Sequence, residues 1–321
     1  MDFLINYGFF LAKTVTIVIA ILVVIAAIVA LKAKAKAALE MGSLDIQSLN
    51  EKYDELADAM NECTLTKAEK KAKKKNTKNK KTDEKSKRLF VLRFDGDIKA
   101  SGVDALRESI TAILLSASQE DEVLLCLESG GGMVPHYGLA ASQLQRIRNA
   151  NIALTVAIDK IAASGGYMMA CVANQIIAAP FAIIGSIGVV AQLPNFHRLL
   201  KKNDIDFEQI TAGEYKRTLT LFGENTKEGR EKLQSEINDT HALFKSFVGM
   251  HRPEVVIDNI ATGEHWYATQ CLERKLVDSI QTSDDYLLSK KTSHQLFEVN
   301  YKVKQSLLKR FNFLARQLFL G

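Results

Sequence analysis

The chain has 321 residues, of which 47% are hydrophobic and 25% are charged. This ordinary globular composition excludes collagen-like, fully disordered and disulfide-scaffold proteins. The net charge of +5 is unevenly distributed, because residues 67–88 alone carry 12 basic and 3 acidic side chains. The rest of the chain is therefore slightly acidic, and the basicity belongs to one segment and not to the folded body.

The first predicted element is a membrane-spanning helix. Residues 14–31 are 18 consecutive uncharged residues, and at about 1.5 Å per residue they would span roughly 27 Å, close to the hydrocarbon thickness of a bilayer. A cleaved signal peptide is the alternative, since Ala33-Lys34-Ala35 resembles a cleavage site. The apolar core of a signal peptide is shorter, however, typically about 7–15 residues. We therefore expect residues 1–36 to form an uncleaved anchor.

Residues 37–88 are predicted to be a polar and then lysine-rich linker, with a helix possible from residue 44 onward. Apolar side chains recur there at heptad-like steps of four and three, which leaves open a short coiled contact between copies or a lone amphipathic helix. They are Leu49, Tyr53, Leu56, Met60 and Cys63. Residues 67–88 have almost nothing to bury and are predicted to be a solvated linker; attraction to anionic lipid is the alternative. No aromatic residue interleaves the lysines, so nucleic-acid binding is not expected.

From residue 89 onward the pattern changes to an alternation of strands and helices. Strands are predicted at residues 89–94, 122–127, 152–158, 175–179 and 207–211, and helices at 103–118, 134–148, from 164, and at 227–248. This alternation predicts an α/β fold built of repeated units. Residues 161–196 carry no charge but contain several glycines and two prolines. They are better explained as short buried elements than as a second membrane span.

Two glycine-rich turns each lead from a predicted strand into a predicted helix. One reads Ser129-Gly130-Gly131-Gly132 and the other Ala163-Ser164-Gly165-Gly166. Glycines permit tight turns and expose backbone N–H groups near a helix start, so the pair could build an oxyanion hole. A P-loop is excluded, because no Gly-Lys-Ser/Thr follows.

Ser164 is the candidate nucleophile, although an N-capping serine is the simpler structural interpretation. Small residues flank it and leave space for a substrate carbonyl. No histidine occurs between Ser164 and His197, so a base near in sequence is missing. Lys216 follows the predicted strand at 207–211 and could serve as the base in place of a histidine, because a lysine buried beside a neutral serine can accept the serine proton. The alternative for Lys216 is an ordinary surface position beside Arg217.

Taken together, five segments resemble the signal-peptide-peptidase-A family of membrane-bound serine proteases, in its short branch with a single N-terminal anchor. They are Leu127–Met133, Asp159–Tyr167, Gly185–Val189, Gly213–Lys216 and Lys275–Asp278. The segments run in the family's order and cover about residues 89–280. One departure is Gly130, which stands where the family usually has proline and makes the turn less rigid.

The resemblance implies a crotonase/ClpP-type fold of ββα units, with Ser164 as nucleophile and Lys216 as general base. It also implies a ring-like homo-oligomer in which the two residues can come from neighbouring subunits. In the resulting mechanism, the oxyanion would be held by N–H groups of Gly131 or Gly132 and of Gly165. No metal, nucleotide or other cofactor is expected.

The expected substrates are peptides, such as signal-peptide remnants or fragments of membrane proteins, at the bacterial inner membrane. The family suggests a periplasmic catalytic domain, whereas the lysines that follow the anchor favour a cytoplasmic one. Residues 89–285 would form the protease domain and 286–321 a C-terminal extension. In that extension, residues 303–320 are predicted to be a basic amphipathic helix, either packed on a neighbouring subunit or lying on the bilayer.

Three competing interpretations remain open at this point. A crotonase-like acyl-CoA enzyme would share the fold and the backbone oxyanion hole but would not need the pair of Ser164 and Lys216. A membrane-anchored ring could instead be a non-catalytic scaffold that binds partner proteins. Finally, His197 could replace Lys216 as the base, although a surface position at a helix start is the simpler interpretation for it.

Overall fold

The computed structural model describes residues 8, 10–25, 42–66, 68–70 and 87–302. The chain divides into two units, one of residues 1–44 with 301–321 and the other of residues 45–300. In the first unit, residues 10–25 are helical and their side chains are exposed.

The membrane-related predictions fall only partly on described residues. Within the part of the chain that the structure describes, no helix combines the length and apolarity needed to cross a bilayer. The predicted span of residues 14–31 runs past residue 25, and residues 26–31 lie outside the described residues. The same is true of residues 71–86 in the lysine-rich segment and of the predicted helix at 303–320.

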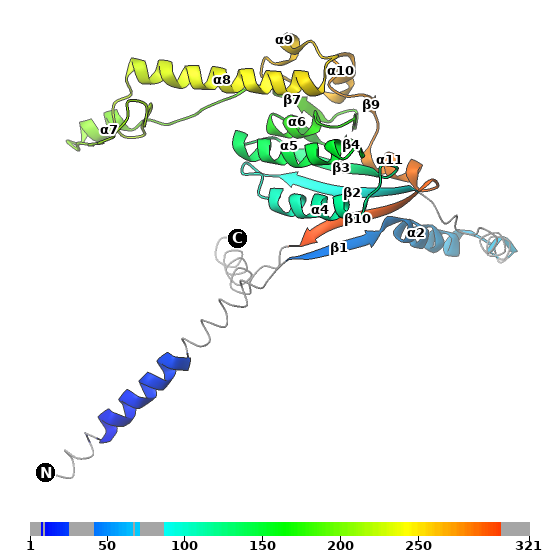
Figure 1. Ribbon diagram of the computed structural model, residues 1–321, viewed down its shortest axis with the longest axis horizontal. Coiled ribbons are helices and arrows are strands. Elements are labelled where there is room, and N and C mark those ends of the chain that lie inside the picture. The colour runs from blue at the N-terminus through cyan, green and yellow to red at the C-terminus, as the bar shows by residue number, and fades with distance from the viewer. Residues whose placement is uncertain (1–7, 9, 26–41, 67, 71–86, 303–321) are drawn as a thin grey trace. The chain divides into compact units, whose positions relative to one another are not determined.

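A sheet that has ten strands among the described residues organises the larger unit (Figure 1). Its main path runs β1-β10-β2-β3-β4-β6-β9, and each pair from β10 to β9 is parallel. The strands are β1 (Ser43–Ser48), β2 (Lys87–Gly96), β3 (Glu122–Ser129), β4 (Ala153–Ile158), β5 (Ile161–Ala163), β6 (Gln175–Ala178), β7 (Ile183–Gly185), β8 (His265–Tyr267), β9 (Ser279–Ile280) and β10 (His294–Lys302).

The central strands are rich in apolar residues because both faces of the sheet are covered, as is usual for parallel sheets. In β3, Val123, Leu125 and Leu127 enter one core, while Leu124 enters the other. Successive side chains of a strand point to opposite faces of the sheet, so one continuous apolar run contributes to both cores.

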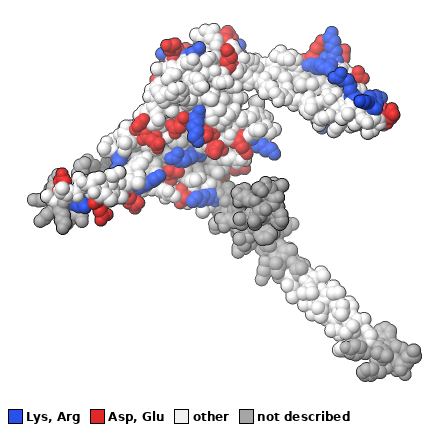
Figure 2. Space-filling model, turned by 180° about the vertical axis from the view of Figure 1, so that it is seen from behind, with Lys and Arg blue, Asp and Glu red and all other residues white. Residues whose placement is uncertain are grey.

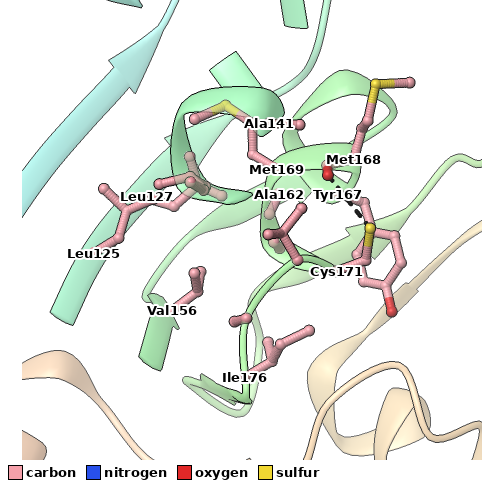
Figure 3. Packing of buried hydrophobic residues seen from close by; sticks show 14 of the residues in the cluster. Leu125, Leu127, Ala141, Val156, Ala162, Tyr167, Met168, Met169, Cys171 and Ile176 are labelled. Atoms are coloured by element: carbon pink, nitrogen blue, oxygen red, sulfur yellow. Dashed lines mark hydrogen bonds between the residues drawn. The ribbon is translucent and has the colours of Figure 1, made fainter. Parts of the chain in front are cut away.

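Helices cover both faces of the sheet. The larger core lies under α4 (Val103–Ser116), α5 (Val134–Asn149) and α6 (Gly165–Ala170), and the smaller one under α2 (Leu49–Thr64) and α11 (Ser283–Lys290). Figure 3 shows the larger core around α6, where buried residues of that helix pack over Leu125, Leu127 and Val156. The remaining helices are α7 (His197–Lys202), α8 (Lys227–His251), α9 (Ile257–Ile260) and α10 (Ala268–Glu273).

The sheet branches at the end of β3, and this branch positions the site. Residues 122–126 of β3 pair with β4, whereas Ser129 pairs with Ala162 of β5. Strand β5 then pairs with β7 in parallel, and β7 pairs with β8 in antiparallel fashion. As a result, the chain leaves β3 and β5 at neighbouring points, and the two glycine-rich turns lie next to each other.

Most of the predicted elements in residues 89–248 are confirmed, but the strand at residues 207–211 is wrong. Ile205, Phe207 and Ile210 are 52%, 42% and 96% exposed, and no strand among the described residues pairs with this segment. Most of the uncharged stretch of residues 161–196 forms short buried elements, namely β5, α6, β6 and β7, as expected. Its last part differs, because residues 191–196 are exposed and form neither a helix nor a strand.

The segments outside the predicted protease domain also differ in detail from expectation. Residues 43–48 form a strand where a helix was expected, because α2 begins only at Leu49, where the Ser48 side chain accepts the Glu51 N–H. In α2, Leu49 is buried against the chain's own sheet, whereas Leu56 and Met60 are exposed. A coiled contact between copies through this exposed half stays a prediction.

Candidate active site

Ser164 lies at the junction of β5 and α6 in a backbone conformation that few residues adopt. Its φ is +50° and its ψ −119°, which is costly for a residue with a β-carbon. Hydrogen bonds hold it on both sides: the Ser164 N–H donates to the Gly185 carbonyl at 2.8 Å, and the Ser164 carbonyl accepts the Met168 N–H at 3.0 Å. Its hydroxyl makes no capping hydrogen bond to α6. The simple N-cap interpretation therefore does not account for this serine.

The turn after β3 lies in direct contact with Ser164. Gly131 has a φ of +89°, and a β-carbon on it would be 2.7 Å from both the Ser164 Cβ and the Gly165 nitrogen. A β-carbon on Gly132 would overlap the Ile98 carbonyl. Side chains at these two positions would push the turn away from the serine, which explains why the site needs glycines here.

The glycines after Ser164 allow α6 to pack closely against its neighbours. A β-carbon on Gly165 would overlap the ring of Tyr137, and one on Gly166 would overlap the carbonyl of Ser129. Tyr137 is fully buried, and its hydroxyl lies 2.6 Å from the Ser129 Oγ. The two turns are therefore joined through backbone contacts and through one aromatic side chain.

The three expected oxyanion donors are not equivalent in the structure. The Gly131 N–H already donates to the Ser129 Oγ at 3.0 Å. The N–H groups of Gly132 and Gly165 have no hydrogen-bond acceptor among the described residues. Two donors close to Ser164 are thus available to a ligand, and the third is used to fix the turn.

Lys216 lies in an exposed arm, which we define as residues 189–226 between β7 and α8. Its neighbour Tyr215 lies under the Lys232 ammonium, with 5.3 Å between Nζ and the ring centroid. Helix α8 is buried in the body only further along, at Phe244 and Val248. Phe244 lies twelve positions after Lys232 on this helix, which corresponds to a rise of about 18 Å.

The structure therefore does not bring Lys216 and Ser164 together within one chain. Lys216 is exposed, and neither of the two residues contacts the other among the described residues. His197, the alternative base, lies in the same arm, where its Nδ1 is 3.3 Å from the Phe222 carbonyl. Figure 1 shows α7 and its surroundings at the opposite end of α8 from α6.

Sequence reasoning left Tyr137 unassigned, although it contacts both glycine turns. The available signal was chemical: a tyrosine on the apolar face of a predicted helix buries its hydroxyl, and a buried hydroxyl needs a hydrogen-bond partner. That signal does not identify the partner, because Ser129 lies eight positions earlier, at the end of a strand.

Comparisons with known proteins match nearly the whole chain. The model of the N-terminal part of peptidase family S49 matches residues 2–144, and that of peptidase family S49 matches residues 146–296. The probable protease SohB of Haemophilus influenzae is 50% identical over 333 residues, covering 98% of this chain and 94% of the relative. The probable protease SohB of Buchnera aphidicola subsp. Schlechtendalia chinensis is 52% identical, covering 90% and 100%.

More distant similarities were found as well. The putative protease MJ0651 of Methanocaldococcus jannaschii is 34% identical over 51% of this chain and 53% of its own. Among solved structures, a mutant of the 1510-N membrane-bound stomatin-specific protease in complex with a substrate peptide has a TM-score of 0.45 and 12% identity, covering 71% of this chain and 98% of that one.

Proposed function

The chain belongs to peptidase family S49 and is therefore a peptidase, and from this premise we propose that it is a membrane-anchored serine endopeptidase with Ser164 as nucleophile and Lys216 as general base. The observation that carries the proposal is the close contact of Ser164 with the turn at Gly131. An uncapped serine in a strained conformation, with two unoccupied N–H groups nearby, has the form of a nucleophile beside an oxyanion hole.

The proposed reaction is acyl transfer to the serine. The Lys216 amine accepts the proton of the Ser164 hydroxyl while the serine oxygen attacks the peptide carbonyl carbon. The N–H groups of Gly132 and Gly165 donate to the oxyanion that develops on the carbonyl oxygen. The lysine then gives the proton to the leaving amine, and water hydrolyses the acyl-enzyme to free Ser164.

Because Lys216 lies in the exposed arm, beyond the start of α8, we propose that it serves Ser164 of a neighbouring copy in a homo-oligomeric ring. The arm has the surface expected of a segment that packs on another copy, since it exposes many large apolar side chains. The most exposed are Val190 (77%), Leu199 (56%), Ile205 (52%), Ile210 (96%) and Tyr215 (55%). Assembly would bury this surface and bring the base to the nucleophile.

Residues 14–31 are the proposed membrane anchor, and residues 303–320 a second, amphipathic contact with the bilayer. The uncharged run and the helix observed over residues 10–25 support the anchor. Acidic and basic side chains are interspersed on the face of the larger unit seen in Figure 2, which fits peptide substrates better than a polyanion. Peptides released from signal sequences or membrane proteins would reach the enzyme at the membrane surface.

The order of elements also supports a crotonase/ClpP-type arrangement. The run β4, β5 and α6 is a ββα unit, and its short second strand belongs to the branch that carries β7 and β8. In such a unit the helix starts directly at the second strand, which is where Ser164 lies.

Fluorophosphonate labelling of the full-length protein in detergent tests the proposal, because only a nucleophilic serine reacts. We expect covalent labelling and peptide hydrolysis, both abolished by Ser164→Ala. Ser186→Ala is the matched control, since Ser186 also has a positive φ, +51°, and directly follows Gly185, whose carbonyl accepts the Ser164 N–H. This variant should still be labelled. Absence of labelling in the wild-type oligomer would overturn the proposed role of Ser164 as the nucleophile.

A further inference from the structure

Tyr137 contacts both glycine-rich turns. It lies on α5 and is fully buried. Its ring packs so closely on Gly165 that a β-carbon there would overlap it, and its hydroxyl lies 2.6 Å from the Ser129 Oγ. One rigid side chain therefore contacts the helix start that follows Ser164 and the residue that begins the turn after β3.

A directed chain of hydrogen bonds leads from the first turn through Tyr137. The Tyr137 hydroxyl donates its single proton to the Asp97 carbonyl at 2.7 Å. The Ser129 hydroxyl must then be the donor in its 2.6 Å contact with Tyr137, which leaves the Ser129 Oγ free to accept the Gly131 N–H at 3.0 Å. The Gly96 carbonyl is a second, longer acceptor for the Ser129 hydroxyl at 3.3 Å, and the contact with Tyr137 is the shorter of the two. Tyr137 and Gly96 together hold the Ser129 side chain in the orientation that accepts the Gly131 N–H.

The turn needs such support because its own residues supply none. Gly130, Gly131 and Gly132 have no side chains, and glycine peptides rotate easily. The Gly131 N–H is bonded to the Ser129 Oγ, and the Ser129 rotamer is in turn held by Tyr137. If this hydrogen bond is lost, the peptide planes on either side of Gly131 can rotate, and the Gly132 N–H no longer points toward the oxyanion.

We propose that Tyr137 is a positioning residue that aligns both N–H donors of the oxyanion hole, acting on Gly132 through Ser129 and on Gly165 through its ring. This inference rests on the proposed function, because an oxyanion hole has meaning only if Ser164 is the nucleophile. Donors in such a hole must lie about 2.7–3.1 Å from the oxyanion, so small rotations of the turn reduce the rate.

Tyr137→Phe tests the role of the hydroxyl, since it keeps the ring on Gly165 and removes only the hydrogen bonds. Ser129→Ala removes the next link, and Tyr286→Phe is the matched control. The Tyr286 hydroxyl is also buried, 3.3 Å from both Thr155 Oγ1 and Glu122 Oε2, but it belongs to the smaller core. All variants are assayed as full-length protein, at a temperature where circular dichroism shows each of them folded.

For Tyr137→Phe we expect kcat and the rate constant of fluorophosphonate labelling to fall about ten-fold, which is less than the loss of a whole donor. KM should change by less than about two-fold, because the oxyanion forms only in the transition state. Ser129→Ala should behave alike, and the double variant should be no worse than either single one. Tyr286→Phe should keep both rates.

Wild-type kcat in folded Tyr137→Phe would overturn the inference. Should that variant not fold, Ser129→Ala decides, because it leaves the tyrosine ring in place; an unchanged kcat there would be equally decisive against it. Labelling that survives Ser164→Ala has a different meaning, because it would overturn the proposed function and this inference together. Labelling that Ser164→Ala abolishes and Tyr137→Phe leaves at the wild-type rate would overturn the inference alone.

Discussion

Gly131 lies so close to Ser164 that a β-carbon on the glycine would be 2.7 Å from the β-carbon of the serine. Real β-carbons do not approach this closely, so the turn after β3 can lie beside Ser164 only with glycine at this position. The φ of +89° adds a second requirement, because residues with a β-carbon rarely adopt it.

Gly131→Ala is therefore expected to lower kcat about a hundred-fold, because it displaces the turn by a distance near 1 Å. It should also destabilise the fold by about 1–2 kcal/mol from the left-handed backbone alone. Gly130→Ala is the control: a β-carbon there would meet only the Ile161 Cδ1, at 3.8 Å. Kinetics and thermal unfolding of both variants check this, and equal losses in the two would contradict it.

A second prediction concerns the pairing of Lys216 with Ser164 between copies. Ser164→Ala and Lys216→Ala should each be inactive. When the two variants are unfolded and reassembled together, neighbouring copies can combine an intact serine with an intact lysine. Random mixing in a cyclic ring would restore about a quarter of the sites. Hydrolysis by the mixture is the measurement.

The mixing experiment also separates two arrangements. If the dyad forms within one chain, every mixed oligomer stays inactive, because no chain carries both residues. Mixing the two variants as preformed oligomers, without reassembly, is the control and should give no activity.

The central strands and the turn at Ser164 could be predicted from the sequence, since both follow from local patterns. The apolar run in β3 predicts a buried parallel strand, and the glycines beside Ser164 predict a tight turn into a helix. Strands β5 and β7 were missed because three residues each carry no readable periodicity. Their existence depends on the branch at Ser129, which is a long-range pairing.

The error at residues 207–211 has a related cause. An aromatic residue followed by two β-branched residues, here Phe207, Ile210 and Thr211, favours a strand when burial is assumed, but burial is a property of the assembled fold. Here Phe207 and Ile210 are exposed in the single chain. The position of Lys216 was unpredictable for the same reason, because the predicted strand was the basis for placing it near the site.

A third prediction concerns acid stability through Asp121, which is 3% exposed at the start of β3. Burial alone would raise the pKa of its carboxyl, but hydrogen bonds from Arg88 and Ser118 outweigh burial and lower the pKa to about 2. The ordinary value is 3.8. The stabilisation is thus fully present above about pH 4 and is lost as the pH falls toward 2, a contribution of about 2 kcal/mol at neutral pH.

Asp121→Asn should therefore lower the free energy of unfolding at pH 7 by at least that amount and flatten its dependence on pH between about 4 and 2. Asp206→Asn is the control, because its ion pair with Lys201 is exposed on both sides and such pairs contribute little. Denaturant unfolding at a series of pH values measures both. A pH dependence unchanged in Asp121→Asn would show that other carboxyls account for the acid sensitivity.

The last prediction concerns the arm. Ile210 is 96% exposed, the most exposed large apolar side chain among the described residues, and lies six positions before Lys216. If the arm packs on a neighbouring copy, that isoleucine becomes buried on assembly, which is worth about 1.5–3 kcal/mol per contact. A charge at this position would be buried without a partner and would oppose assembly. Ile210→Glu should therefore shift the protein toward smaller species in light scattering and lower hydrolysis in proportion.

Leu115→Glu is the matched control, since Leu115 is 85% exposed but lies on α4, away from the arm. A contact between copies requires that Ile210→Glu lowers both oligomer size and hydrolysis. A variant that keeps the wild-type oligomer size but loses hydrolysis would contradict this prediction and would place Ile210 in substrate binding.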